Sequence, residues 1–287
     1  MKITPLTSNT FASDGGAMFG LVPKGIWKRF CPPDDHNLIP QRANSWLIET
    51  DDGKKGLLES GCGNPDWYSE RERALHHLEE SWWLEQSLQR LEIKYEDIDF
   101  IVLSHAHWDH AGGLMDPEGN PVFPNAEIFL RQEEVECVLG EDPLLYKSYP
   151  PKIRETFKKL SPHIFPVPDD DPEMLPGLYL LPARGHSEGQ AGIYFSSTEI
   201  AGRGEEKFSA LFAGDNCPSQ HHLRMVFQTA YDTYPLKTRA WKQKWLPRCA
   251  KDNLLLLFTH DPEAYGAWIV ADEKHEYVVR ELYTGES

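Results

Sequence analysis

The segment from Ser104 to Gly113 reads Ser-His-Ala-His-Trp-Asp-His-Ala-Gly-Gly, and it constrains the fold more than any other part of the chain. Three imidazoles and one carboxylate follow directly after the largely apolar run of residues 98–103; they belong to His105, His107, Asp109 and His110. Without partners, three titratable rings and a charge at the end of a buried strand would be costly to bury. A divalent metal ion removes this cost, because neutral imidazoles and carboxylates are ligands that zinc takes in proteins.

Three later strand-like runs also end in residues able to bind a metal. Residues 178–181 run into Gly185-His186, residues 208–213 into Gly214-Asp215, and residues 254–258 into Thr259-His260. Side chains at the ends of neighbouring strands can meet at one edge of a sheet. We therefore expect His186, Asp215 and His260 to lie beside the cluster at residues 105–110.

The whole pattern resembles the metallo-β-lactamase-fold hydrolases. The resemblance rests on His-x-His-x-Asp-His at residues 105–110, followed in order by Gly-His, Gly-Asp and a late His, and it extends from about Asn44 to His260. It implies an α/β fold of the αββα sandwich type, with two mixed β-sheets face to face and helices on the outer faces. It assigns His105, His107 and His186 to a first metal ion. It assigns Asp109, His110 and His260 to a second, with Asp215 bridging both.

Hydrolytic chemistry follows from that arrangement. Two ions about 3.5–4 Å apart can share a hydroxide, because metal binding lowers the pKa of water to roughly 7. The resemblance implies that this hydroxide attacks a carbonyl carbon while the metals polarise the carbonyl and stabilise the leaving oxygen. It makes Asp109 the catalytic residue that carries a proton to the leaving group. Zinc is the expected metal for both sites, and iron, manganese or cobalt would fit the same ligands.

Among the branches of the family, the chain looks most like the N-acyl homoserine lactonases and related esterases. The Ala-Gly-Gly tail of the cluster, Asp215 and the segment of residues 15–20 carry this similarity. It predicts that Met18, Phe19 and Leu21 line an apolar wall for an acyl chain. The lactone or ester is thus the expected substrate.

Two departures separate the chain from several of those lactonases. They have a tyrosine three positions after the bridging aspartate, where this chain has Pro218. Many members also have Leu-Ile-Asp-Thr-Gly on an early strand, where this chain has Leu-Leu-Glu-Ser-Gly at residues 57–61. Glu59 could replace that outer carboxylate with a longer side chain.

Other substrates on the same centre stay open at this point: a thioester, a phosphotriester or phosphodiester, or a β-lactam. A non-catalytic metal-binding scaffold is a further alternative, although such members usually lose ligands and all seven positions are filled here. Metal content separates these readings, because an enzyme should hold close to two ions per chain.

Composition limits the remaining classes. The net charge of −16 argues against nucleic acid as a partner, so a small-molecule substrate is expected. No apolar run is long enough to span a membrane. The five cysteines are scattered, and residues 1–6 lack the apolar stretch of a signal peptide, so we predict a cytoplasmic protein. No composition shift divides residues 1–287, which predicts a single domain; a homo-oligomer is compatible with it.

Several other residues carry weaker patterns. The Gly- and Pro-rich residues 15–44 predict a loop, and residues 1–44 together an N-terminal segment that covers the active site. We expect Trp108 to pack under the metal loop, Asp261 to form a turn and Cys217 to be inert. The tandem pairs His76-His77 and His221-His222 are expected on the surface or in loops.

Overall fold

Two β-sheet layers and the helices outside them build the computed structural model, which describes residues 1–145 and 149–285. One layer follows the order β1 to β6: β1 (Lys2–Asp14), β2 (Leu38–Glu49), β3 (Lys55–Leu58), β4 (Phe100–Val102), β5 (Glu127–Arg131) and β6 (Ile164–Val167). The other contains β7 (Glu173–Leu175), β8 (Leu178–Pro182), β9 (Ala191–Ile200), β10 (Lys207–Phe212), β11 (Leu255–Leu257), β12 (Gly266–Asp272) and β13 (Glu276–Tyr283). The layers join where Lys2 and Ile3 pair in parallel with Glu199 and Ile200.

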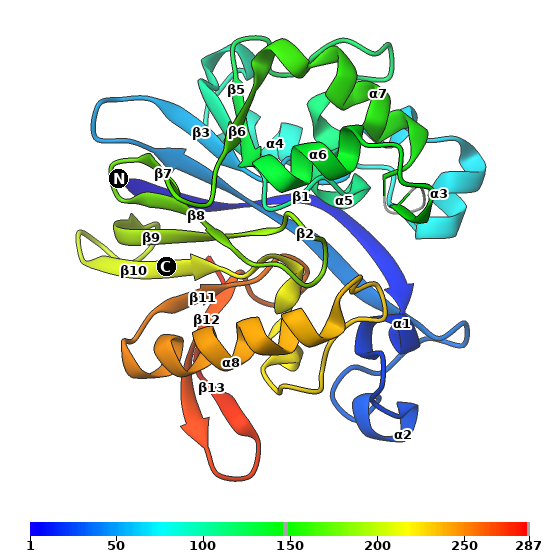
Figure 1. The fold of residues 1–287 in the computed structure, drawn as a ribbon, viewed down its shortest axis with the longest axis vertical. Helices are drawn as coiled ribbons and strands as arrows, with labels where there is room; N and C mark the ends of the chain where they lie inside the picture. Colours follow the sequence, from blue (N-terminus) through cyan, green and yellow to red (C-terminus); the bar gives the residue numbers. More distant parts are fainter. Residues whose placement is uncertain (146–148, 286–287) are drawn as a thin grey trace.

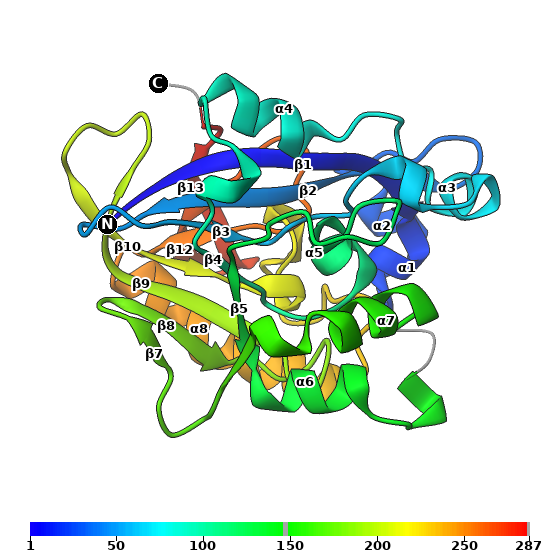
Figure 2. The ribbon, with the colours of Figure 1, turned by 90° about the horizontal axis from the view of Figure 1, so that it is seen from above.

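The helices lie on the outer sides of the two layers. Figure 1 shows α4 (Trp83–Arg90), α6 (Gln132–Leu139) and α7 (Pro151–Lys159) on the side of β3 to β6, and α8 (Pro235–Lys251) beside β10 to β12. The shorter helices are α1 (Gly15–Phe19), α2 (Lys24–Trp27), α3 (Glu70–His76) and α5 (Trp108–Ala111). Seen from above in Figure 2, α4 covers β1 and β2 while α8 lies at the opposite face. The predicted αββα sandwich is confirmed.

Strands buried on both faces explain the continuous apolar runs in the sequence. In β2, Trp46 and Ile48 point into the core shared by both layers, whereas Leu47 points to the core beneath α4. In β10, Phe212 enters the shared core and Leu211 packs with α8. Because successive strand residues face opposite sides, each run supplies two cores at once. Three apolar layers therefore alternate with the two sheets.

The predicted N-terminal loop is shorter than expected. β1 pairs with β2 from Lys2↔Glu49 to Asp14↔Leu38, so residues 38–44 belong to a strand and not to the loop expected over residues 15–44. That residues 1–44 cover the active site stays a prediction. Pro5 is tolerated in β1 because β1 pairs with β9 at Lys2 and Ile3 and not farther along. A residue after Ile3 that lacks an N–H therefore loses no hydrogen bond to β9. Within residues 1–44, Met1 and residues 15–37, which include α1 and α2, lie outside the strands.

The ligand-bearing segments all follow strands of this sandwich. The parallel pairs β3–β4 and β10–β11 end at the same edge of their layers. The loop after β3 contacts the loop after β4 closely, since a Cβ at Gly63 would lie 2.4 Å from the carbonyl oxygen of Gly112. Gly63 also has a φ of 82°, a left-handed conformation that glycine adopts without strain. Glycine at this position lets the two loops touch.

Replacing Gly63 by alanine should test that contact. We expect Gly63→Ala to lower the free energy of unfolding by about 2–4 kcal/mol, because it adds a backbone clash to the cost of a left-handed residue with a side chain. Gly53→Ala is the matched control: its φ is 89°, but no atom lies within 4 Å of the added Cβ. Urea unfolding of both variants measures the difference, and equal losses would contradict the close-contact argument.

Candidate metal centre

Three imidazoles converge at the edge where β4 and β8 end. The Nε2 atom of His105 and the Nε2 atom of His186 each lie 3.0 Å from Nδ1 of His107. Nitrogens this close cannot all carry protons, and three of them around one point form a set that could hold a divalent cation. This group is the one that the family resemblance assigns to a first metal.

A second group lies next to the first. The Nε2 atom of His260 lies 3.5 Å from Oδ2 of Asp109, and Nε2 of His110 lies 3.8 Å from Oδ1 of the same carboxylate. Asp109, His110 and His260 thus form another set whose ligand atoms could share one ion. Asp109 is the most exposed of the three, with 15% of its side chain accessible. That exposure places its carboxylate where a bound molecule could reach it.

Asp215 joins the two groups. Its Oδ1 lies 3.4 Å from Nε2 of His110 and 3.3 Å from Nε2 of His260, while its Oδ2 lies 3.4 Å from Nε2 of His186. Each carboxylate oxygen therefore faces a different group. The hydroxyl of Thr259 donates to Oδ1 at 2.9 Å and helps to hold this orientation. All seven residues predicted from the sequence are brought together in this way.

Backbone contacts explain how segments from both layers reach one place. The carbonyl of His110 accepts hydrogen bonds from the amide and the hydroxyl of Ser60, at the end of β3. Asn44 of β2 holds residues 258–261 of the other layer. Its backbone N–H donates to the carbonyl of Thr259, and its side-chain amide donates to the carbonyl of Phe258. His260 is thereby held against the first layer, although it follows a strand of the second.

Outer hydrogen bonds orient the rings of the ligands. Glu59 accepts from Nδ1 of His110 at 2.9 Å, and Asp232 lies 3.1 Å from Nδ1 of His186. Such carboxylates fix the tautomer, so the opposite Nε2 of each ring is free to coordinate. The suggestion that Glu59 supplies the outer carboxylate is consistent with this contact. The backbone of Glu59 is left-handed, with a φ of 65°.

The protonation states suit a metal site. Burial lowers the pKa of His105 and of His107 well below the usual histidine value, so both rings are neutral, which is the form that binds metal. Burial opposes the charged form of Asp215, but the neighbouring imidazoles, that of His260 foremost, hold the pKa of this carboxyl well below its usual range. Burial opposes the charged form of His110 and His186 as well, but the carboxylate of Asp215 foremost raises the pKa of both rings.

A divalent cation would satisfy two buried imidazole nitrogens of the centre. Within residues 1–145 and 149–285, the Nε2 atoms of His110 and His260 are buried without a hydrogen-bond partner. Buried polar atoms without partners are costly, and both point toward carboxylate oxygens of Asp109 and Asp215. Coordination of a cation would satisfy them. The donor set of imidazoles and carboxylates is one that zinc, iron, manganese and cobalt all accept.

The predicted acyl wall is not an open surface. Met18 and Phe19 are buried in a small core with Trp27, and the ring of Phe19 stacks on that of His222 at 5.0 Å. Leu21 is 77% exposed. The two buried side chains are used for packing, because α1 is too short to hold its place without such contacts. His222 is therefore not a surface residue as expected: it is buried, and its Nε2 lies 2.9 Å from the carbonyl oxygen of Met18.

Other predictions about single residues agree with the structure. Trp108 packs against Phe11 and Tyr68, and the ring of His76 stacks on it at 4.1 Å. Asp261 caps a turn by accepting from the amides of residues 263 and 264. Cys217 is a buried free cysteine outside all three candidate metal groups, the third of which is formed by His105, His110 and Asp215.

The position of the missing tyrosine has a different task in this chain. The carbonyl of Pro218 accepts from the amide of His260 at 2.8 Å and so supports a ligand. A phenol reaches this region from another loop. Burial, together with the charges of Asp109 and Asp14, raises the pKa of Tyr231, and this side chain is 52% exposed. Tyr231 thus lies within electrostatic range of the most accessible carboxylate of the centre.

Sequence patterns did not reveal the outer residues Asp232 and Glu134. Asp232 lies in an irregular segment far from the ligand that it contacts, and no spacing connects the two. Glu134 stands among four glutamates in residues 133–141, where it looks like part of a solvated helix face. Its side chain is instead completely buried.

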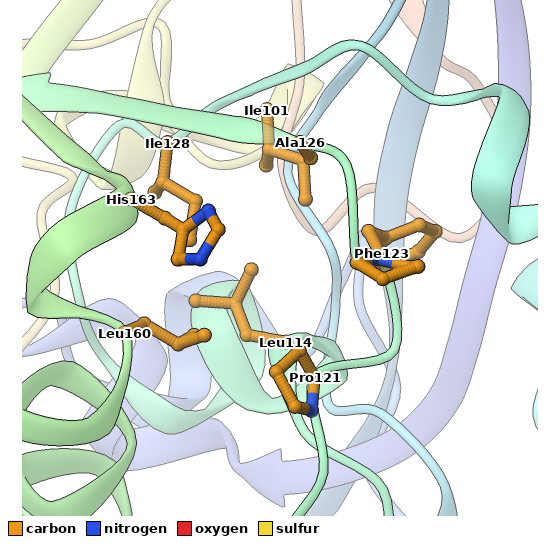
Figure 3. A pocket seen from close by; sticks show the side chains of 9 residues that line it. Ile101, Leu114, Pro121, Phe123, Ala126, Ile128, Leu160 and His163 are labelled. Atoms are coloured by element: carbon orange, nitrogen blue, oxygen red, sulfur yellow. The ribbon is translucent and has the colours of Figure 1, made fainter.

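The pocket in Figure 3 is separate from this centre. It is lined by apolar side chains of β4, β5 and the loops beside them, with His163 at one side. None of its lining residues belongs to the three candidate metal groups. Its apolar lining makes it a gap in the packing beneath α7 rather than a second reactive site.

Comparisons with known proteins agree with this geometry. The family described as the metallo-beta-lactamase superfamily matches residues 38–201. An N-acyl homoserine lactonase of Bacillus thuringiensis is 29% identical over 167 residues, which are 55% of this chain and 59% of the relative. The match therefore spans less than two thirds of that relative's length.

Solved structures extend the similarity over the whole chain. A protein described as a probable metal-dependent hydrolase from Staphylococcus aureus has 27% identity and a TM-score of 0.83, with 98% of this chain and 97% of that chain covered. A dizinc quorum-quenching lactonase, solved in complex with a product, has 21% identity and a TM-score of 0.77, with 98% and 94% covered. The second likeness supports the fold alone.

Removal of metal should destabilise the protein. We expect a strong chelator to lower the midpoint of thermal unfolding, because an ion at a hundred times its dissociation constant stabilises the folded state by about 2.7 kcal/mol per site. Elemental analysis before chelation should find close to two ions per chain. His186→Ala should reduce this number, whereas His163→Ala, at the pocket of Figure 3, should not. A protein that contains no metal before chelation and whose midpoint of thermal unfolding does not change with the chelator would contradict the assignment.

Proposed function

Because the chain belongs to the metallo-beta-lactamase superfamily, we propose that it is a hydrolase with two divalent metal ions that opens lactones or cleaves carboxylic esters. The observation that carries the proposal is the position of Asp215, whose two oxygens face two separate groups of imidazoles. The lactone substrate is supported by the 29% identity to a protein named as an N-acyl homoserine lactonase.

The proposed metal ligands follow the two groups. His105, His107 and His186 would hold one ion, Asp109, His110 and His260 the other, and Asp215 both. When bound, two such ions supply Lewis acidity and activated water at neutral pH. Zinc is the metal that we propose for both sites, given the imidazole-rich ligands.

The residues of the chain contribute position and proton transfer. Asp109 is the proposed catalytic residue, because its carboxylate is the accessible one and could hand a proton to a leaving alkoxide oxygen. Glu59 and Asp232 hold the rings of His110 and His186 in fixed tautomers, so the coordinating nitrogens need no reorganisation during turnover. Thr259 keeps one oxygen of Asp215 directed at the second group.

We keep several broader expectations as proposals. Residues 1–287 would act as a single domain, since one hydrogen-bonded path of strands runs from β13 to β6. The partner would be a small molecule rather than a nucleic acid, given the charge of −16. Across the described residues no helix has the length and apolar character needed to cross a membrane. A cytoplasmic location and a homo-oligomeric state stay predictions.

A substrate panel tests the reaction class. Zinc-loaded protein is incubated with acyl homoserine lactones, simple lactones, aryl esters, thioesters, β-lactams and phosphotriesters, and initial rates are compared as kcat/KM. We expect the highest values for lactones or carboxylic esters. Selective cleavage of a thioester, a phosphotriester or a β-lactam would move the substrate class while keeping the centre, and no turnover of any of them would favour a binding scaffold.

A substitution at the bridging position tests the mechanism. Asp215→Asn should lower kcat by at least about a hundredfold, because the neutral amide cannot serve both groups as a charged bridge. Asp252→Asn, an exposed aspartate at the end of α8, is the matched control and should keep the activity of the original protein. Metal content is measured in parallel. Full turnover in Asp215→Asn with both ions retained would refute the two-metal mechanism.

A further inference from the structure

Glu134 is a completely buried carboxylate in α6 that none of the proposed chemistry uses. Its Oε1 accepts from the backbone amide of Ala106 at 2.9 Å and from the phenol of Tyr149 at 2.7 Å. Its Oε2 accepts from the hydroxyl of Ser187 at 2.6 Å. Ala106 stands between His105 and His107, and Ser187 follows His186. One carboxylate thus holds both segments that carry the three-imidazole group.

The packing around α6 makes this contact tight. A Cβ at Gly189 would lie 2.0 Å from the amide nitrogen of Glu134, so the 186–189 segment runs directly against the first turn of the helix. Tyr149 is buried on the other side, with its ring 5.4 Å from that of His107. Glu134 therefore sits between the two segments with little freedom to move.

The three imidazoles differ in how they are otherwise held. His105 has Ser104 3.0 Å from its Nδ1, and His186 has Asp232 3.1 Å from its own. His107 faces the other two rings through Nδ1, and its Nε2 is buried without a hydrogen-bond partner among the described residues. Nδ1 lies close to the main chain, so the position of the backbone sets the position of this ligand atom. The bond from Ala106 to Glu134 fixes the backbone one residue earlier.

The donors around Glu134 support its charged form against burial. Burial raises the pKa of this carboxyl overall, and the hydrogen bonds from Ser187, Ala106 and Tyr149 offset part of that rise. A carboxylate in a site of low dielectric favours a cation nearby. Glu134 thus adds an acidic side chain beside the three imidazoles, in addition to Asp215, whose Oδ2 faces His186.

From these contacts we propose that Glu134 is a positioning residue for the three-imidazole metal site, acting by clamping the 105–107 and 186–187 segments to each other. This inference rests on the proposed function, since it presumes that the group binds a metal. It predicts an effect confined to one of the two sites. Glu59 is the corresponding outer carboxylate of the other site, because it joins His110 to the amide of Ser104.

Cobalt titration can separate the two sites. Metal-free protein is titrated with Co²⁺ in the presence of a competing chelator, and the visible absorption yields two dissociation constants. His186→Ala and His260→Ala identify which constant belongs to which group. Glu134→Gln should weaken the site that His186→Ala removes by about tenfold to a hundredfold, the range found when outer partners of metal ligands are lost. The other site should keep its affinity.

Matched variants separate this role from a general loss of structure. Glu136→Gln changes an exposed glutamate of the same helix, which accepts from Gln132, and should alter neither constant. Glu59→Gln should weaken the opposite site. If Glu134→Gln does not fold, Ser187→Ala removes the clamp from one segment alone and should weaken the same site to a smaller extent.

The outcomes decide the inference separately from the proposed function. Equal weakening of both sites by Glu134→Gln, or no weakening, overturns the positioning role. A native chain that binds fewer than two Co²⁺ ions refutes the two-metal centre itself. A chain that binds two ions and responds to Glu134→Gln as expected, yet cleaves no lactone or ester, leaves the inference standing and removes only the proposed substrate.

Discussion

The carboxylate of Asp215 between two groups of buried imidazoles is the interaction on which the rest of the centre depends. Its oxygens lie 3.3–3.4 Å from the nitrogens of His110, His186 and His260, which follow three different strands. A charge buried this deeply is stable only when cations or donors surround it. Because the imidazoles that face it belong to both sheet layers, its stabilisation requires the two layers to be closed on each other.

The backbone contacts at this edge supply that closure. The amide of Ala191, at the start of β9, donates to the carbonyl of Ser104 at 2.7 Å, directly before the first ligand. Asn44 holds the segment that carries His260, and the pairing of β1 with β9 joins the layers farther along. Each link connects a strand end of one layer to the other layer. The ligand geometry is therefore a property of how the two layers pack, and a loop taken alone would not keep it.

The residues that could be predicted were those whose chemistry is dense in the sequence. The apolar run before His105 indicated a buried strand, and the same strand-then-ligand pattern led to His186, Asp215 and His260; the family resemblance then gave the sandwich and the division into two groups. Of the outer carboxylates, Glu59 could be suggested from its place in the family motif, whereas Asp232 and Glu134 could not, because their contacts depend on burial and on segments distant in the sequence. Glu134 differs from its neighbour Glu133 only in facing inward, which a glutamate-rich helix does not reveal. For β1, the polar residues Thr7, Ser8 and Asn9 concealed a strand whose polar groups are satisfied by neighbouring segments: Ser8 contacts Ser45 of β2, and Asn9 accepts from the backbone N–H of Cys62.

The place of the predicted acyl wall depends on contacts that no local pattern encodes. The loop expected over residues 15–44 carries Met18 and Phe19, and its first part is held by the segment of residues 218–234: the backbone N–H of Ala230 donates to the carbonyl of Ala17, and His222 contacts Met18. Lys242 of α8 in turn donates to the carbonyls of His222 and Phe227 and holds the second segment. The same segment carries Asp232, which lies 3.1 Å from Nδ1 of His186. A change in the packing of Phe19, whose ring stacks on His222, would thus be transmitted through this segment to the ring of a candidate metal ligand.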